Sequence, residues 1–257
     1  MRHLSFMLPL LLLPAVVHAQ NLRDFHWVPL PPTKPVMVNG VPFDPESAGK
    51  SWSILRADNA KSNVYRFEVR SGDMWSEDAR QGAIVERSEL DGWRANWNEN
   101  TDIWCAYSLF IERGRPYNSA WTGIGQLHGQ RALYAPLYVG LKNDMLSVGT
   151  WLPAPGGSWA PSTLFVVEIT REIWHNVVFH FRANLTGSGV IEFWIDSKKM
   201  ADFKGAVGGV PSDAVYWKFG IYRGYGPIAV PLAVRFSNVE VGTKVLADRV
   251  VSPLPID

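Results

Sequence analysis

Residues 216–223 of this 257-residue chain read Tyr-Trp-Lys-Phe-Gly-Ile-Tyr-Arg, so apolar and polar side chains alternate. Successive side chains of a β-strand point to opposite faces. One face of this stretch is apolar and holds Trp217, Phe219 and Ile221. The other is polar and holds Tyr216, Lys218 and Tyr222, with Gly220 leaving a gap among them. The stretch therefore predicts a strand with a buried face and a polar face that burial alone does not explain.

The rest of the chain repeats this pattern of short β-type runs separated by Gly, Pro, Asn, Asp or Ser. Helix-period stretches are nearly absent, and a single turn is predicted at Pro211–Ala214. So many short strands predict an all-β domain built as an antiparallel two-sheet sandwich, whose concave outer face forms a groove suited to a polymer. The predicted strands are Ser51–Leu55, Val64–Arg70, Ala83–Leu90, Ile103–Glu112, Gly123–His128, Leu137–Leu141, Met145–Thr150, Thr163–Glu168, His175–Arg182, Val190–Ile195, Lys199–Phe203, Ala214–Tyr222 and Ala233–Val241.

The N-terminus has the form of a secretory signal peptide, predicted for residues 1–19. A short basic start is followed by an apolar run at Phe6–Val17, which is too short to span a bilayer as a helix. Residues 20–35 are Pro-rich and are expected to run extended, and residues 36–257 are expected to form a single domain. We therefore expect a secreted or periplasmic protein without a membrane segment.

Charge and cysteine content narrow the function classes. Without the signal, which holds one Arg and no acid, 24 basic and 24 acidic side chains remain. This balance argues against nucleic acid and weakly against a heavily sulfated partner. Cys105 is the only cysteine, so no internal disulfide is possible, and its strand-like setting favours a buried apolar role.

Metal binding receives little support from the histidines. After processing, only His26, His128, His175 and His180 remain, without tight ligand spacing. We expect no metal site and no cofactor, with a structural calcium left open, and a monomer.

Two further polar motifs lie on predicted strands. In Gly125-Gln126-Leu127-His128-Gly129, Gln126 and His128 share a face between small residues that permit close approach of a ligand. In Glu86-Arg87-Ser88-Glu89-Leu90, Arg87 and Glu89 share a face. Each motif alone also fits a surface histidine or a surface ion pair, which contributes little stability.

Taken together, the polar faces fit β-elimination on a uronic-acid polymer. The difficult step removes the C5 proton, which is alpha to a carboxylate that resists further negative charge. Arg87 and Gln126 would bind this carboxylate, and one such donor is worth roughly 3 kcal/mol. His128 or Tyr222 would take the proton, and Tyr222 would protonate the leaving O4.

These motifs, in this order, resemble those of the β-jelly-roll (concanavalin A-like) polysaccharide lyases. In the jelly-roll alginate lyases the corresponding strands read Arg-(Thr/Ser)-Glu, Gln-(Ile/Val)-His and Tyr-Phe-Lys-x-Gly-x-Tyr. Residues 174–224 look more like the glucuronan lyase and heparin lyase I-like group.

The resemblance implies roles for individual residues. It makes His128 and Tyr222 catalytic, Arg87 and Gln126 carboxylate-binding, and Lys218 a supporting groove residue. Glu89, Tyr216 and Arg223 are expected to join them as substrate-binding residues. The Arg223-Gly224 ending departs from the alginate lyase pattern and shifts the expected anionic substrate from alginate toward glucuronan.

Two other function classes stay open on this fold. A retaining glycoside hydrolase needs two carboxylates about 5 Å apart. Glu86 and Glu89 lie three residues apart and so face opposite ways. A non-catalytic carbohydrate-binding module would use the aromatic residues but needs no convergence of His, Tyr and Arg.

Overall fold

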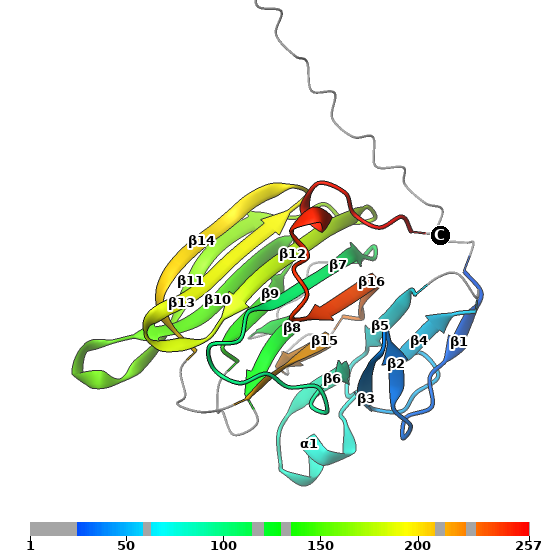
Figure 1. Cartoon of the computed structure of the whole chain (residues 1–257). Coiled ribbons are helices and arrows are strands. Elements are labelled where there is room, and N and C mark those ends of the chain that lie inside the picture. The colour runs from blue at the N-terminus through cyan, green and yellow to red at the C-terminus, as the bar shows by residue number, and fades with distance from the viewer. Residues whose placement is uncertain are drawn as a thin grey trace, which may run out of the picture.

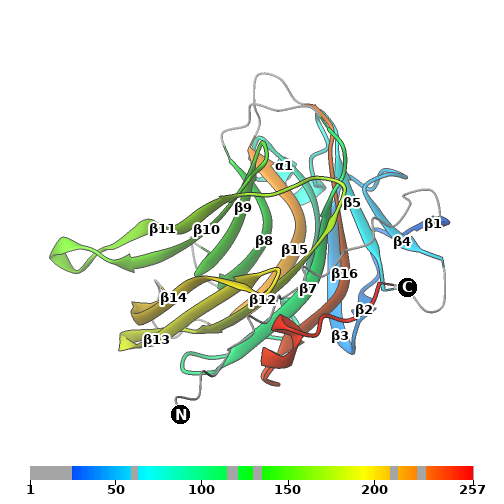
Figure 2. The same cartoon turned by 90° about the horizontal axis from the view of Figure 1, so that it is seen from above.

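The protein is a sandwich of two eight-stranded antiparallel sheets (Figure 1). The computed structural model describes residues 25–58, 63–114, 121–129, 135–208, 214–224 and 230–256. Seen from above, both sheets are strongly bent layers (Figure 2). The all-β, two-sheet fold predicted from the strand pattern is confirmed.

The two sheets draw their strands from distant parts of the sequence. In order across the first sheet lie β1 (Trp27–Pro29), β4 (Ile54–Ala57), β5 (Tyr65–Val69), β16 (Leu232–Gly242), β7 (Ile103–Ile111), β12 (Trp174–Arg182), β13 (Asn184–Ile195) and β14 (Lys198–Val207). In order across the second lie β11 (Trp159–Glu168), β10 (Met145–Pro153), β9 (Leu137–Lys142), β8 (Thr122–Gly129), β15 (Val215–Gly224), β6 (Val85–Asp91), β3 (Val41–Ser47) and β2 (Val36–Val38).

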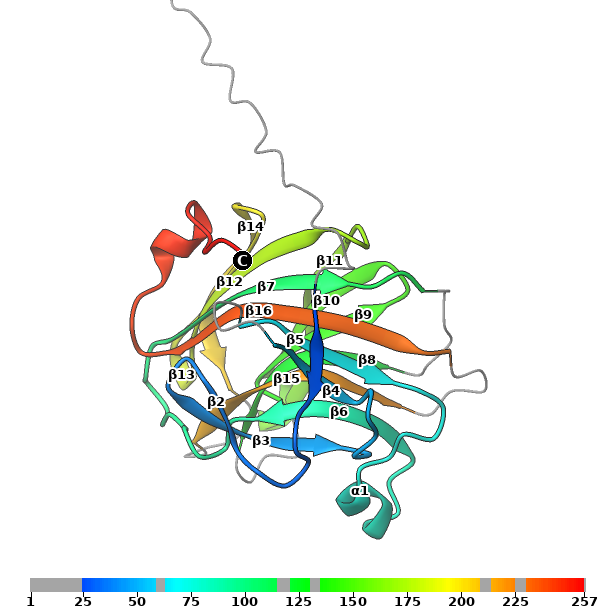
Figure 3. The ribbon, with the colours of Figure 1, turned by 90° about the vertical axis from the view of Figure 1, so that its right-hand side faces the viewer.

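Helices are few in the described part of the chain. They are the α-helix α1 (Ser76–Arg80) and the 3-10 turns η1 (Pro155–Gly157) and η2 (Ala247–Val250). Figure 3 shows α1 beyond the ends of β3 and β6, outside the sandwich. Within the described ranges, no helix has the length and apolar character needed to cross a membrane.

Each of the thirteen predicted runs overlaps an observed strand. The strands β1, β2 and β3 were not predicted. Two of them contain proline, and β1 and β2 are short edge strands, where the ladder tolerates a missing N–H. The signal peptide and most of the predicted turn at Pro211–Ala214 lie outside the described residues.

The inward face of β15 anchors the core. The Phe219 ring meets Phe43, Phe67 and Phe236 edge-on, with ring centroids 5.2 to 5.5 Å apart. Trp217 packs between Tyr107 and Phe179 from the opposite sheet. Truncating one such ring costs about 3–5 kcal/mol, so this packing holds the opposite, polar face of β15 rigidly in place.

Candidate active site

The three polar motifs lie on neighbouring strands of the second sheet. β15 pairs with β6 on one side and with β8 on the other. Their polar side chains share the outer face of this sheet, because the inward positions are filled by the apolar core. The sequence interpretation requires the three motifs to lie on adjacent strands, and β6, β15 and β8 are adjacent.

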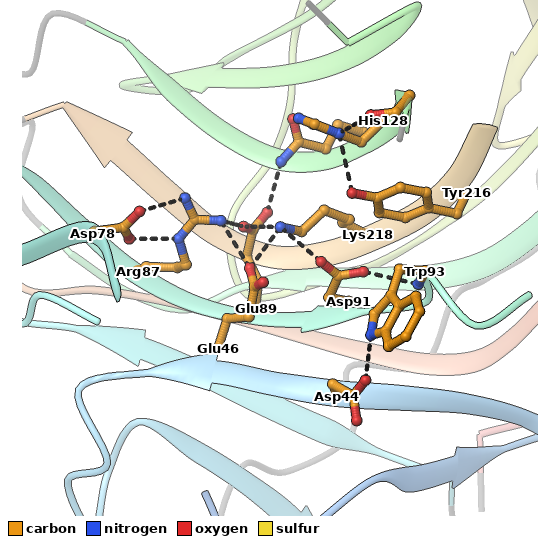
Figure 4. Close-up of polar contacts among 12 residues, drawn as sticks. Asp44, Glu46, Asp78, Arg87, Glu89, Asp91, Trp93, His128, Tyr216 and Lys218 are labelled. Carbon is orange, nitrogen blue, oxygen red and sulfur yellow. Dashed lines mark hydrogen bonds and ion pairs between the residues drawn. The ribbon is translucent and has the colours of Figure 1, made fainter. Parts of the chain in front are cut away.

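The strand register sets which polar side chains are neighbours. Tyr216 lies opposite His128 of β8, and Lys218 lies between Gln126 of β8 and Asp91 of β6. Further along, Gly220 lies opposite Glu89, and Tyr222 lies opposite Arg87. Figure 4 shows most of these side chains converging above the sheet.

Arg87 is held by three carboxylates. Its Nε and Nη2 donate to Asp78 of α1 at 2.7 and 3.0 Å, and its Nη1 donates to Glu46 at 2.8 Å and to Glu89 at 3.0 Å. Burial opposes the charge on the guanidinium, but these carboxylates outweigh it and raise the pKa of Arg87. Every nitrogen of the guanidinium thus already has a carboxylate partner.

Lys218 is the second cation of the site and is only 4% exposed. Its Nζ lies 2.5 Å from Glu46, 3.2 Å from Asp91 and 3.7 Å from Glu89. Burial lowers the pKa of Lys218, and the negative charges of Glu89, Glu46 and Asp91 outweigh this and raise it. Burial, followed by the nearby Glu46, raises the pKa of Asp91 to about 7 despite Lys218.

Sequence reasoning missed three members of this group, which we call the carboxylate cluster (Glu46, Asp78, Glu89 and Asp91). Asp91 had a signal, because it continues the alternation of Arg87 and Glu89 one step beyond the predicted end of that strand. Glu46 and Asp78 come from β3 and α1, and no local pattern links them to the motif.

His128 is oriented as a base. Its Nδ1 lies 2.7 Å from the carbonyl oxygen of Gly129, which only accepts hydrogen bonds, so Nδ1 carries the proton and Nε2 keeps its lone pair. The Tyr216 hydroxyl lies 3.1 Å from the same Nδ1. Burial, and then the charge of Lys218, lowers the pKa of His128, so the ring is neutral at neutral pH.

Tyr222 lies at the other end of the site. Its ring is half-buried, with the Arg87 guanidinium 3.8 Å from its centroid and Trp121 edge-on at 4.7 Å. Burial raises the pKa of Tyr222 although Arg87 opposes this, so the phenol keeps its proton. Tyr222 lies six positions after Tyr216 along β15, a strand of a strongly bent sheet. The site therefore has a His128–Tyr216 end and an Arg87–Tyr222 end.

Gly220 lies on β15 between the two ends, opposite Glu89. Its φ is +134°, and a Cβ at this position would collide with the Ser88 carbonyl oxygen. A side chain is therefore excluded there by the backbone itself. Gln126 donates from Nε2 to Glu89 at 3.2 Å.

Arg223 does not join the other predicted site residues. It continues the inward series of Trp217, Phe219 and Ile221, is 1% exposed, and forms a buried ion pair with Glu86. Its Nη1 also donates to the Val230 carbonyl at 2.6 Å. Strand alternation places this side chain on the core side, away from the polar face.

We expect Arg223→Met to destabilise the fold by about 3–5 kcal/mol, because it leaves the Glu86 charge buried without its partner. Chemical denaturation followed by fluorescence measures this loss. The double variant Arg223→Met/Glu86→Leu removes both charges and should recover a large part of it. Equal stability of Arg223→Met and the parent chain would contradict a structural role for this pair.

The remaining candidates outside this face are engaged in packing or ion pairs. His175 contacts Asp196 at 2.7 Å, and His180 contacts Asp102 at 2.7 Å and Glu192 at 3.0 Å. Cys105 is buried, and burial raises the pKa of its thiol. In the described ranges, no group of three or more His, Cys, Asp or Glu side chains is arranged to hold a metal ion.

Solved structures with the same fold include several lyases. The endo-β-1,4-glucuronan lyase of the fungus Trichoderma reesei matches with a TM-score of 0.57 and 14% identity over 70% of this chain and 81% of that one. Alginate lyase AlgAT5 of polysaccharide lyase family 7 matches with a TM-score of 0.53 and 15% identity over 76% and 84%. The alginate lyase from Corynebacterium sp. matches with a TM-score of 0.53 and 13% identity over 75% and 82%.

Sequence comparison assigns the family more directly. No curated protein sequence matches the chain. The family model for polysaccharide lyases, in contrast, matches residues 50–244, which include all three polar motifs and most of both sheets. This match spans well over half of the chain and agrees with the jelly-roll fold of the structural relatives. The chain belongs to the polysaccharide lyase family.

Proposed function

We propose that this lyase is secreted and cleaves a polymer of uronic acid by β-elimination, with glucuronan as the first candidate and alginate as the second. The observation that carries the proposal is the state of the two predicted catalytic residues. His128 is neutral with a lone pair on Nε2, and Tyr222 keeps its proton beside a cation. A base and an acid thus lie on the same polar face, on the neighbouring strands β8 and β15.

In the proposed reaction, His128 Nε2 takes the C5 proton of a uronate unit. The electron pair left on C5 forms the C4–C5 double bond, and the C4–O4 bond breaks. Tyr222 gives its proton to the departing O4, and the Arg87 guanidinium against its ring stabilises the phenolate that remains. No water is consumed, and one product carries an unsaturated uronate at its end.

The substrate carboxylate gains negative charge during proton removal. The Gln126 amide and the buried cations Lys218 and Arg87 are joined through Glu89 and Glu46 on this face. The motif predicts that Arg87 binds the substrate carboxylate directly. To do so, Arg87 must first break its hydrogen bonds to one of its carboxylate partners. We therefore assign Arg87 and Lys218 chiefly an electrostatic role, held in place by the carboxylate cluster.

Two observations support glucuronan ahead of alginate. The sequence between Trp174 and Gly224 resembles the glucuronan lyase group, and the Arg223-Gly224 ending departs from the alginate lyase pattern.

Incubating the protein with glucuronan, alginate and heparin while following ultraviolet absorbance of unsaturated uronates tests this proposal. We expect absorbance to rise fastest with glucuronan. New reducing ends without absorbance would indicate a hydrolase, and binding without either signal would indicate a binding module. Faster cleavage of a neutral polymer than of any polyuronate would contradict the proposed role of the carboxylate.

A further inference from the structure

A row of mutually paired residues crosses the second sheet through the site. The register places Asp44 opposite Asp91, Asp91 opposite Lys218, and Lys218 opposite Gln126. The row continues through Tyr138 and Gly149 and ends at Thr163 of β11. It crosses seven strands, or about 29 Å at the usual strand spacing. Each end of this row carries a tryptophan.

Trp93 stands at the β3 end and is 44% exposed. Its backbone N–H donates to Asp91 at 2.8 Å, and its indole N–H donates to Asp44. Arg94 stacks 4.6 Å from its ring centroid and pairs with Asp44 at 2.9 Å. Figure 4 shows Trp93 beside Asp91 and Asp44, next to Lys218 and Tyr216. A large exposed ring is thus fixed before any ligand arrives, which lowers the entropic cost of binding.

Trp151 stands at the other end, in a cleft of about 250 Å³ on the β9–β11 side of the sheet. Tyr138, Ser147 and Thr163 also line this cleft, so its described lining combines two aromatic rings with hydroxyl groups. Uncharged hydroxyl donors beside an aromatic surface suit a sugar ring, which has an apolar C–H face and a polar rim.

Glycines shape the floor between the cleft and the catalytic residues. A Cβ on Gly123 or Gly140 would lie 2.8 Å from the Tyr138 ring. Because glycine has no Cβ, the Tyr138 ring can pack directly against the backbone of β8 and β9. Tyr138 is also the residue opposite Gln126. The aromatic lining of the cleft is therefore next to Gln126 of the candidate site.

We propose that the polysaccharide lies across the strands along this row, with Trp93 and Trp151 as sugar-stacking platforms at opposite ends of the bound segment. This inference rests on the proposed function and adds the direction of the chain and two specificity-determining residues. The cleft at Trp151 recognises a sugar by stacking and hydroxyl contacts rather than by its carboxylate. The two platforms thus lie on opposite sides of the bond that is broken.

The test is the cleavage pattern of a hexasaccharide of the preferred polyuronate, labelled at its reducing end. Removing one tryptophan weakens sugar binding at that end of the groove. The hexasaccharide then binds more often in positions that occupy the tryptophan at the other end. We expect Trp93→Ala and Trp151→Ala to move the preferred cleavage position in opposite directions. Each should also raise KM for the polymer roughly three- to tenfold. Trp52→Ala is the matched control, because Trp52 also donates to an aspartate and stacks on an arginine but lies outside the row.

Shifts in the same direction, or no shift in folded variants, would overturn the proposal. A chain running along β15 would instead make Trp121→Ala shift the pattern while the Trp93 and Trp151 variants leave it unchanged. If the parent protein cleaves no polyuronate, the proposed function fails, and the groove is tested separately by affinity electrophoresis in glucuronan. Unchanged retention of both variants in that gel would contradict the groove as well.

Discussion

Replacing His128 with Ala should lower kcat on the preferred polyuronate on the order of a hundredfold or more, because the proton at C5 then has no positioned base. The residue is held by the Gly129 carbonyl and the Tyr216 hydroxyl, and its ring makes little contribution to the core. The fold should therefore remain intact by circular dichroism and thermal unfolding. A folded His128→Ala variant with near-normal turnover would contradict the assignment.

The pH dependence provides a second readout for His128. Only the neutral ring acts as a base, so activity should fall as the pH drops through the pKa of His128. Burial and Lys218 lower that pKa below its ordinary value of 6.5, so kcat/KM should hold down to a pH below 6.5. Tyr216→Phe is the informative comparison, since it removes only the hydroxyl near Nδ1. This variant should shift the pH at which kcat/KM falls on the acidic side while leaving substantial turnover. An unchanged pH profile would argue against coupling between His128 and Tyr216.

Tyr222→Phe is expected to cause a loss of comparable size, again about a hundredfold or more in kcat, because O4 would depart without a proton. The aromatic ring and its stacking on Arg87 and Trp121 are retained in Phe, so binding should change far less than turnover. Steady-state kinetics on the polymer separates the two effects. Loss of activity in Tyr216→Phe but not in Tyr222→Phe would transfer the acid role to Tyr216.

The polar face could be predicted because it follows from alternation within single strands. Tyr216, Lys218 and Tyr222 share a face by parity, as do Gln126 and His128, and the structure places both sets on one sheet surface. The same alternation places Arg223 on the core side of β15. The prediction that Arg223 binds substrate therefore contradicts the alternation of its own strand. The ion pair with Glu86 shows how a charged residue is accommodated there.

The electrostatic setting of the site could not be predicted, since it depends on long-range contacts. Glu46 lies on β3, 41 residues before Arg87, and Asp78 comes from a five-residue helix too short to show a helical period. Together they turn Arg87 from an available cation into a fully paired one. The three missed strands have a local cause instead: β1 and β2 are only three residues long, and β1 and β3 contain proline, which weakens the strand signal.

The elimination itself is tested most directly by weighing the two fragments of a single cleavage. Mass spectrometry of a labelled polyuronate oligosaccharide after brief reaction should give two fragments whose masses add up to that of the substrate. The fragment with the new non-reducing end should then be lighter, by one water, than its saturated counterpart. Two saturated fragments, whose summed mass exceeds the substrate by one water, would show hydrolysis and contradict the mechanism derived from His128 and Tyr222.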